Sequence, residues 1–197
     1  MKRSEINKAL KELETMCAQY RFALPPFCHF TSEEWQTKGH EYDEVRECML
    51  GWDITDYGKG DFDHFGFSLI TIRNGNRALA DKYSKVYAEK LLYLKEGQYA
   101  PNHFHWYKTE DIINRGGGNV LIRVYNSLPD EEIDYHSNVT VHTDGRHLHG
   151  SGGNPNPAHP RREHPHSAAA VPRLHRGGGR RPGAAGRGQP VQRRQHG

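Results

Sequence analysis

The chain has 197 residues and a formal charge of +3, a length that normally forms one domain with a substantial core. The charge is uneven, because residues 147–197 hold nine arginines, no lysine and one acid (+8), which leaves −5 for residues 1–146. The positive total therefore predicts no specific nucleic-acid partner, although the basic segment could bind nucleic acid non-specifically.

No apolar run is long enough for a signal peptide or a membrane span, so we expect a cytoplasmic protein with no membrane partner. Cys17, Cys28 and Cys48 lack C-x-x-C spacing, which fits a reducing compartment better than a disulfide framework.

Residues 1–50 have the pattern of helices. Apolar side chains recur at helical spacing from Ile6 to Tyr20 and predict an amphipathic helix over residues 4–21. Thr31-Ser32-Glu33-Glu34 has the sequence of a capping box and predicts a second helix that reaches about Cys48. We expect both helices to pack against a β-domain or a partner subunit.

From Gly51 onward, short apolar stretches alternate with turn residues. Two of these turns, Asn74-Gly75 and Asp144-Gly145, are strong hairpin signals. This pattern predicts a mainly β protein, with a β-barrel over residues 51–146 and helices added at its N-terminus. The predicted strands cover residues 65–72, 86–94, 97–106, 120–125 and 139–143.

The strongest functional signal is the group His103, His105 and Glu110. Side chains two residues apart on a strand point to the same face, so both imidazoles can reach one ion. Glu110 is five residues beyond His105, and a bend after His105 must bring its carboxylate back to them. Two imidazoles and a carboxylate suit a divalent ion such as Mn²⁺, Fe²⁺, Zn²⁺ or Ni²⁺. The alternative is a pair of solvated histidines beside a surface glutamate.

Lys90 is a second candidate. It alternates with Val86, Ala88, Leu92 and Leu94 and so falls on an apolar face of the predicted strand 86–94. A lysine in an apolar stripe is either a functional residue or one whose ammonium group extends to water. Both interpretations stay open at this stage.

The segment from Gly97 to Gly118 resembles the first metal-binding motif of the cupins. Within that superfamily, His103-Phe104-His105-Trp106, Lys108, the run Glu110 to Arg115 and the glycines 116–118 closely resemble D-lyxose isomerase. The resemblance runs from about Met1 to Arg146. It implies a cupin (jelly-roll) barrel, a manganese ion in preference to Fe²⁺, Zn²⁺ or Co²⁺, and a homodimer.

The same resemblance implies an activity. Enzymes of this kind interconvert D-lyxose with D-xylulose, and also D-mannose with D-fructose, through a cis-enediolate that the metal stabilises. Lys108 and Lys90 would then be the catalytic residues, their charges stabilising an enediolate oxygen, and Trp106 would bind the sugar with them. Lys108 could instead be a surface lysine on the bend, and Trp106 with Tyr107 could simply pack at a barrel rim. Two other functions remain open: a non-haem metal cupin oxygenase, and a non-catalytic metal- or sugar-binding cupin remnant.

Residues 147–197 differ sharply in composition. They contain no Phe, Trp, Tyr, Ile, Met, Cys, Lys or Thr and are dominated by Arg, Gly, Pro, His and Ala. A segment of this kind buries too little apolar surface to offset its chain entropy, so we expect it to be disordered. We also expect that no strand returns after the Asp144-Gly145 turn, which would leave the barrel incomplete, poorly soluble and weak in metal retention.

Three interpretations compete for this segment: a basic nucleic-acid-binding arm, a weak metal-binding histidine tract, and a shift of reading frame near Arg146. We favour the frame shift, because arginine without lysine, together with Gly, Pro and Ala, is typical of a GC-rich gene read out of frame. The resemblance implies a further histidine ligand and a carboxylate base from later strands. We assign neither role to His159, His164, His166 or His175, which lie in no barrel-like pattern.

Overall fold

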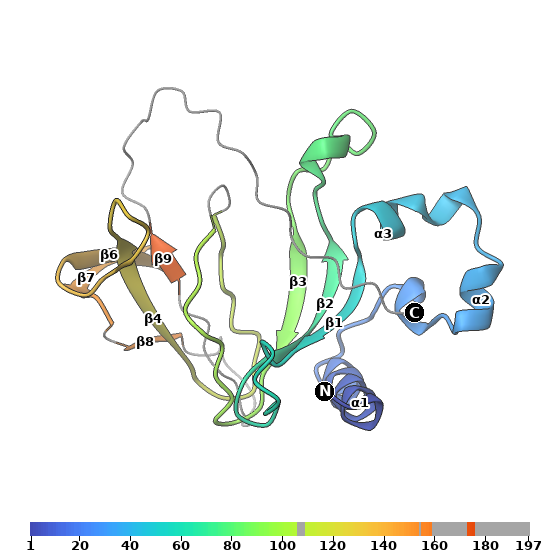
Figure 1. Cartoon of the computed structure of the whole chain (residues 1–197), viewed down its shortest axis with the longest axis horizontal. Coiled ribbons are helices and arrows are strands. Elements are labelled where there is room, and N and C mark those ends of the chain that lie inside the picture. Colours follow the sequence, from blue (N-terminus) through green and yellow to red (C-terminus); the bar gives the residue numbers. More distant parts are fainter. Residues whose placement is uncertain (106–108, 154, 159–172, 176–197) are drawn as a thin grey trace.

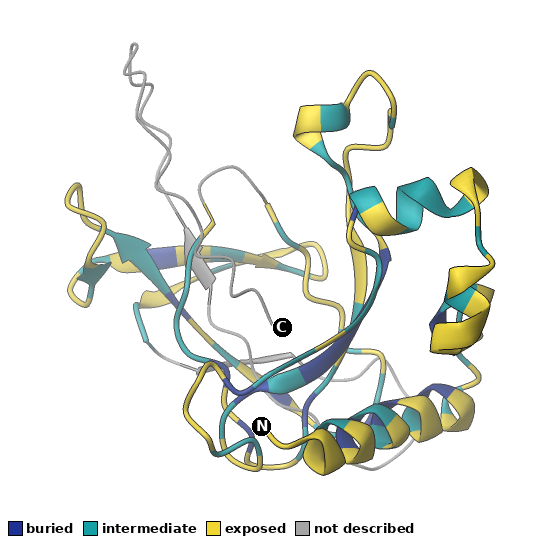
Figure 2. Cartoon of the chain, turned by 45° about the vertical axis from the view of Figure 1, so that its right-hand side comes forward, coloured by how far each residue is buried: buried dark blue, intermediate teal, exposed yellow. Residues whose placement is uncertain are grey.

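A computed structural model describes residues 1–105, 109–153, 155–158 and 173–175 (Figure 1). Helix α1 (Arg3–Gln19) confirms the first predicted helix, and its buried side chains Ala9, Leu13 and Cys17 recur every four residues. This spacing places them on one face of the helix, which lies against a sheet, while its other face is exposed (Figure 2). No helix among the described residues is long and apolar enough to cross a membrane.

The sheet under α1 has the antiparallel order β1-β2-β3 (Figure 1). Its central strand is rich in β-branched and aromatic side chains and is buried along most of its length. Ile70 and Ile72 of this strand pack with Leu13, Cys17 and Cys28 in the main hydrophobic core. The strands are β1 (Gly51–Thr55), β2 (Phe67–Arg73) and β3 (Glu89–Tyr93).

The remaining strands lie on the other side of the segment that links β3 to β4 (Figure 1). Strand β4 pairs with β5 and β8 on an antiparallel path and with β9 in parallel, while β6 and β7 form a separate hairpin. The protein is therefore mainly β with short helices, as predicted, but the described strands form separate sheets and do not close into a barrel. The bounds are β4 (Val120–Ser127), β5 (Ile133–Asp134), β6 (Asn138–Thr143), β7 (Arg146–Ser151), β8 (Pro155–Ala158) and β9 (Arg173–His175).

The predicted second helix begins where expected and ends too early. The Thr31 hydroxyl accepts from the Glu34 N–H (3.1 Å), and the Glu34 carboxylate accepts from the Thr31 N–H (2.7 Å), which is the predicted capping box. The expected continuation to Cys48 is wrong, because the Thr37 hydroxyl bonds to the Glu34 carbonyl (2.7 Å) and the backbone at Gly39 is extended. The segment consists of η1 (Pro26–His29), α2 (Ser32–Gln36), η2 (His40–Tyr42) and α3 (Asp43–Glu47).

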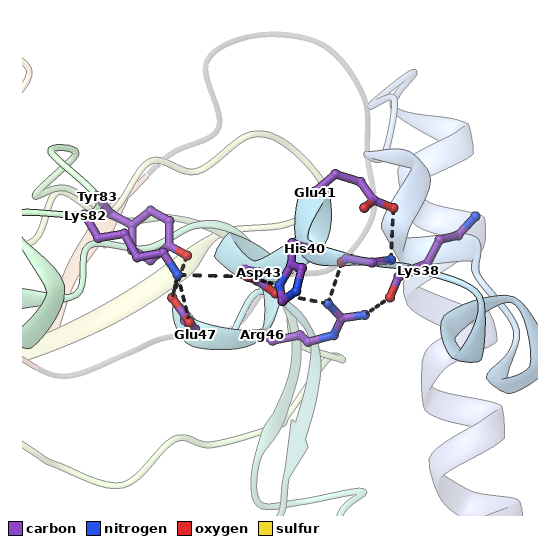
Figure 3. A network of polar contacts seen from close by, with 9 residues as sticks. Lys38, His40, Glu41, Asp43, Arg46, Glu47, Lys82 and Tyr83 are labelled. Atoms are coloured by element: carbon purple, nitrogen blue, oxygen red, sulfur yellow. Dashed lines mark hydrogen bonds and ion pairs between the residues drawn. The ribbon is translucent and has the colours of Figure 1, made fainter.

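A polar network joins α3 to the loop between β2 and β3, which contains η3 (Arg77–Leu79) (Figure 3). The Glu47 carboxylate accepts from Lys82 Nζ (2.8 Å) and from the Tyr83 hydroxyl (2.5 Å). These donors lower the pKa of Glu47, Lys82 being the larger cause. One residue earlier, Arg46 donates to the Lys38 carbonyl (2.7 Å). The network thus anchors the loop that leads into β3.

The expectation that no strand follows Arg146 is wrong. Asp144 and Gly145 have φ of 48° and 76°, the left-handed values that a two-residue hairpin turn requires. Strand β7 returns along β6 in continuous register, from Thr143 opposite Arg146 to Asn138 opposite Ser151. The pairing rests on the turn and on backbone hydrogen bonds, so it does not need alternating apolar side chains on the returning strand. Residues 146–151 therefore form a strand that the composition did not predict.

Candidate metal centre

The segment before the histidines is held in place by buried polar contacts. Gln98 is buried, its side-chain N–H donates to the Phe62 carbonyl, and its side-chain oxygen accepts from the Lys95 N–H (2.9 Å). The Tyr99 N–H bonds to the His64 carbonyl at 2.8 Å. These contacts fix the chain that leads to His103, although residues 97–105 are irregular and do not form the predicted strand.

His103 has a defined orientation. Its Nδ1 lies 3.0 Å from the Pro101 carbonyl, and because a carbonyl only accepts, Nδ1 must carry the proton. In the tautomer with the proton on Nδ1, the lone pair is on Nε2, the usual arrangement for a histidine that binds a metal. Sequence reasoning did not identify the Pro101 carbonyl as a partner, because a backbone contact of this kind has no side-chain signature.

His105 lies close to both other predicted ligands. The ring centroids of His103 and His105 are 5.1 Å apart at an interplanar angle of 75°. His105 Nε2 is 3.4 Å from Glu110 Oε1, and both side chains are about one-third exposed (34% and 28%). Glu110, five residues further along the chain, therefore lies beside His105.

The three side chains lie near one another, but they are not arranged as the ligands of one metal ion. Among the described residues, no group of three or more His, Cys, Asp or Glu side chains has the arrangement of a metal site. The buried cysteines offer no alternative thiolate, because burial raises the pKa of Cys17 and of Cys28 to about 11. The donors available near His105 are therefore imidazole nitrogens and carboxylate oxygens.

Lys90 lies on β3, opposite Thr71 of β2. The predicted strand 86–94 is shorter in the structure, and Val86, at 78% exposure, lies outside it. Lys90 is exposed and alternates with Leu91, which packs against the core cluster, so it lies on the opposite face of the sheet. The strand begins only at Glu89, so Val86 and Ala88 lie outside it, whereas Leu92 lies on the same face as Lys90, opposite Leu69 of β2. The other predicted site residues, Lys108 and Trp106, lie outside the described residues, as does Tyr107.

Comparison with known proteins identifies the class of enzyme as a sugar isomerase. The family model for D-lyxose isomerase matches residues 1–157. The chain is 41% identical over 154 residues to the D-lyxose/D-mannose isomerase of Serratia proteamaculans, covering 77% of this chain and 67% of that one. The D-lyxose/D-mannose isomerase of Escherichia coli O157:H7 is 42% identical with the same coverage. The chain belongs to the D-lyxose isomerase family, as the resemblance predicted, and the match extends past Arg146 to residue 157.

Proposed function

We propose that this protein is a metal-dependent aldose–ketose isomerase that interconverts D-lyxose with D-xylulose, and D-mannose with D-fructose. The observation that carries the proposal is the grouping of His103, His105 and Glu110 in a chain of this family. The names of the two relatives supply the sugars. A cupin barrel that includes residues beyond the described strands, a homodimer and a cytoplasmic location are part of the same proposal.

By donor type, two imidazoles and one carboxylate suit a divalent ion of borderline hardness, although the three side chains do not converge into a metal site in this structure. His103 offers Nε2 because Nδ1 is engaged by the Pro101 carbonyl, and Glu110 holds its oxygen 3.4 Å from His105 Nε2. Two neutral imidazoles with one carboxylate suit Mn²⁺, with Fe²⁺, Zn²⁺ and Co²⁺ as substitutes. When bound, such an ion supplies a Lewis acid that favours negative charge on the sugar oxygens during isomerisation.

The protein side chains then have separate tasks. Glu110 would compensate the charge of a bound ion, and its Oε1 lies 3.4 Å from His105 Nε2. Lys90, exposed on β3, and Lys108 supply ammonium groups that hydrogen-bond the sugar oxygens where charge develops. Trp106 provides an apolar ring surface for the sugar carbons. We propose the last three roles from the family resemblance.

The experiment is D-lyxose isomerisation before and after treatment with a chelator, followed by addition of Mn²⁺. We expect loss of D-xylulose formation with the chelator, recovery with Mn²⁺, and no recovery in a His105→Gln variant. His136→Gln is the matched control, because this histidine is exposed and remote in sequence from the candidate ligands. Equal turnover by the chelated and Mn²⁺-loaded protein would refute the metal dependence. Oxygen-dependent product formation would favour the oxygenase instead.

We also propose that the gene is read out of frame after about codon 146, although the family match ends later, at residue 157. Read one base later, every His codon (CAT, CAC) and Asn codon (AAT, AAC) begins AT or AC and encodes Ile, Met or Thr. The shifted frame thus converts the many histidines of residues 147–197 into residues that largely favour strands. Arginine codons in the same frame begin with G and encode Val, Ala, Asp, Glu or Gly.

The shifted frame contains no stop codon over residues 147–197, whichever synonymous codons the gene uses. In this frame each triplet begins with the second base of an original codon. Because stop codons begin with T, a stop requires an original codon whose second base is T. Each residue with such a codon in 147–197 is followed by His, Pro or Gln, whose codons begin with C, and a triplet ending in C is never a stop. The residues concerned are Leu148, Val171, Leu174 and Val191. If the gene sequence gives no β-strand pattern in this frame, the proposal fails.

A further inference from the structure

The β6–β7 hairpin holds a pair of histidines that the candidate metal centre does not use. His142 and His147 lie directly opposite each other, one pair beyond the Asp144-Gly145 turn. In a hairpin with a two-residue turn, the second pair from the turn is not hydrogen-bonded, and its side chains approach most closely. The two rings are stacked, with centroids 4.1 Å apart and an interplanar angle of 20°.

A third histidine lies on the same face. His149 follows His147 by two residues, so both side chains point to one side of the strand. Its Nδ1 is 2.9 Å from the Thr140 hydroxyl, which fixes the ring and directs Nε2 away from that contact. His142, His147 and His149 are all exposed, so an ion from solution can reach them.

We propose that His142 and His147 form a two-imidazole surface site for a borderline transition-metal ion such as Ni²⁺, Cu²⁺ or Zn²⁺. Imidazole nitrogen suits these ions, whereas Mg²⁺ and Ca²⁺ prefer oxygen ligands. The hairpin register already holds the two rings together, so binding costs little chain ordering. Arg146 alternates with His147 and lies on the other face, which keeps its charge away from the ion.

The site has two protein ligands, and water completes the coordination. This agrees with the finding that no three ligand-type side chains converge among the described residues. Its position separates it from the candidate isomerase centre, which is built from the segment between β3 and β4. The proposal therefore does not depend on the isomerase function, and it concerns the present chain, because the shifted frame would replace His147 with Ile, Met or Thr.

The test is calorimetric titration of the full chain with Ni²⁺, compared with His142→Gln and His147→Gln variants. We expect each variant to lose one equivalent of bound Ni²⁺, while His136→Gln, at an exposed position outside the hairpin, keeps it. Mg²⁺ should give no binding at the hairpin. A His147→Thr variant introduces a β-branched residue, which favours strands, and so guards against loss of the hairpin itself. Unchanged Ni²⁺ stoichiometry in the folded His142 and His147 variants would overturn the proposal.

Discussion

Replacing Ile70 with alanine tests whether the sheet under α1 is the main core. Ile70 is fully buried (0% exposed) and packs with Leu13, Cys17 and Cys28. The change removes three buried carbons, about 2.4 kcal/mol at about 0.8 kcal/mol for each. The cavity left behind adds to this, and we expect the free energy of unfolding to fall by about 3–4 kcal/mol. A loss of this size corresponds to a decrease of roughly 10 °C in Tm for a domain of this length.

The assay is urea unfolding followed by far-UV circular dichroism. Leu121→Ala is the control, because Leu121 on β4 is 49% exposed and removing it should cost about 1 kcal/mol or less. Both variants should keep the denaturant slope of the parent chain. Equal destabilisation by the two changes would show that the packing of α1 on β2 does not dominate the stability, and the reasoning would be refuted.

The remaining predictions concern protonation and surface contacts. Burial raises the pKa of Cys17 and Cys28 to about 11, so the folded state holds these protons more tightly than the unfolded state. Stability should therefore fall as the pH rises from about 9 to 11, and a Cys17→Ala, Cys28→Ala double variant should lose this dependence in pH-resolved urea unfolding. The N–H groups of Gly58 (2.9 Å) and Gly60 (3.1 Å) lower the pKa of Asp56. The ionised Asp56 carboxylate should therefore stabilise the folded state above the pKa that Asp56 has in the unfolded chain, and this stabilisation should be lost at lower pH. In thermal unfolding, Asp56→Asn should be less stable than the parent at pH 7 and nearly as stable at pH 2. Glu47→Gln should loosen the loop that carries Lys82, seen as faster amide hydrogen exchange in residues 74–88 with little change in Tm.

Sequence reasoning succeeded where a single local pattern determines the structure. The helical spacing of Ala9, Leu13 and Cys17 is sufficient for α1, because one apolar face must be buried whatever covers it. The Thr31 capping box likewise fixed the start of α2. The proximity of Glu110 to His105 agrees with the spacing argument, while their role as metal ligands stays a prediction.

The failures came from contacts between segments. The strand that carries Lys90 was expected to begin at Val86, but its length depends on its pairing with β2, which begins at Glu89 opposite Arg73. The returning strand β7 was missed because side-chain alternation was the criterion, whereas backbone pairing after the Asp144-Gly145 turn forms it. The end of α2 depends on a hydroxyl contact of Thr37, which helix propensity alone does not show.

The most direct test of the central claim is conversion of D-lyxose to D-xylulose, with and without Mn²⁺, by two proteins. One is the present chain, and the other continues in the shifted frame after codon 146. We predict Mn²⁺-dependent conversion that is stronger in the frame-shifted protein and is abolished in both by His105→Gln. Absence of conversion by both proteins with Mn²⁺, Co²⁺, Fe²⁺ and Zn²⁺ would contradict the proposed function.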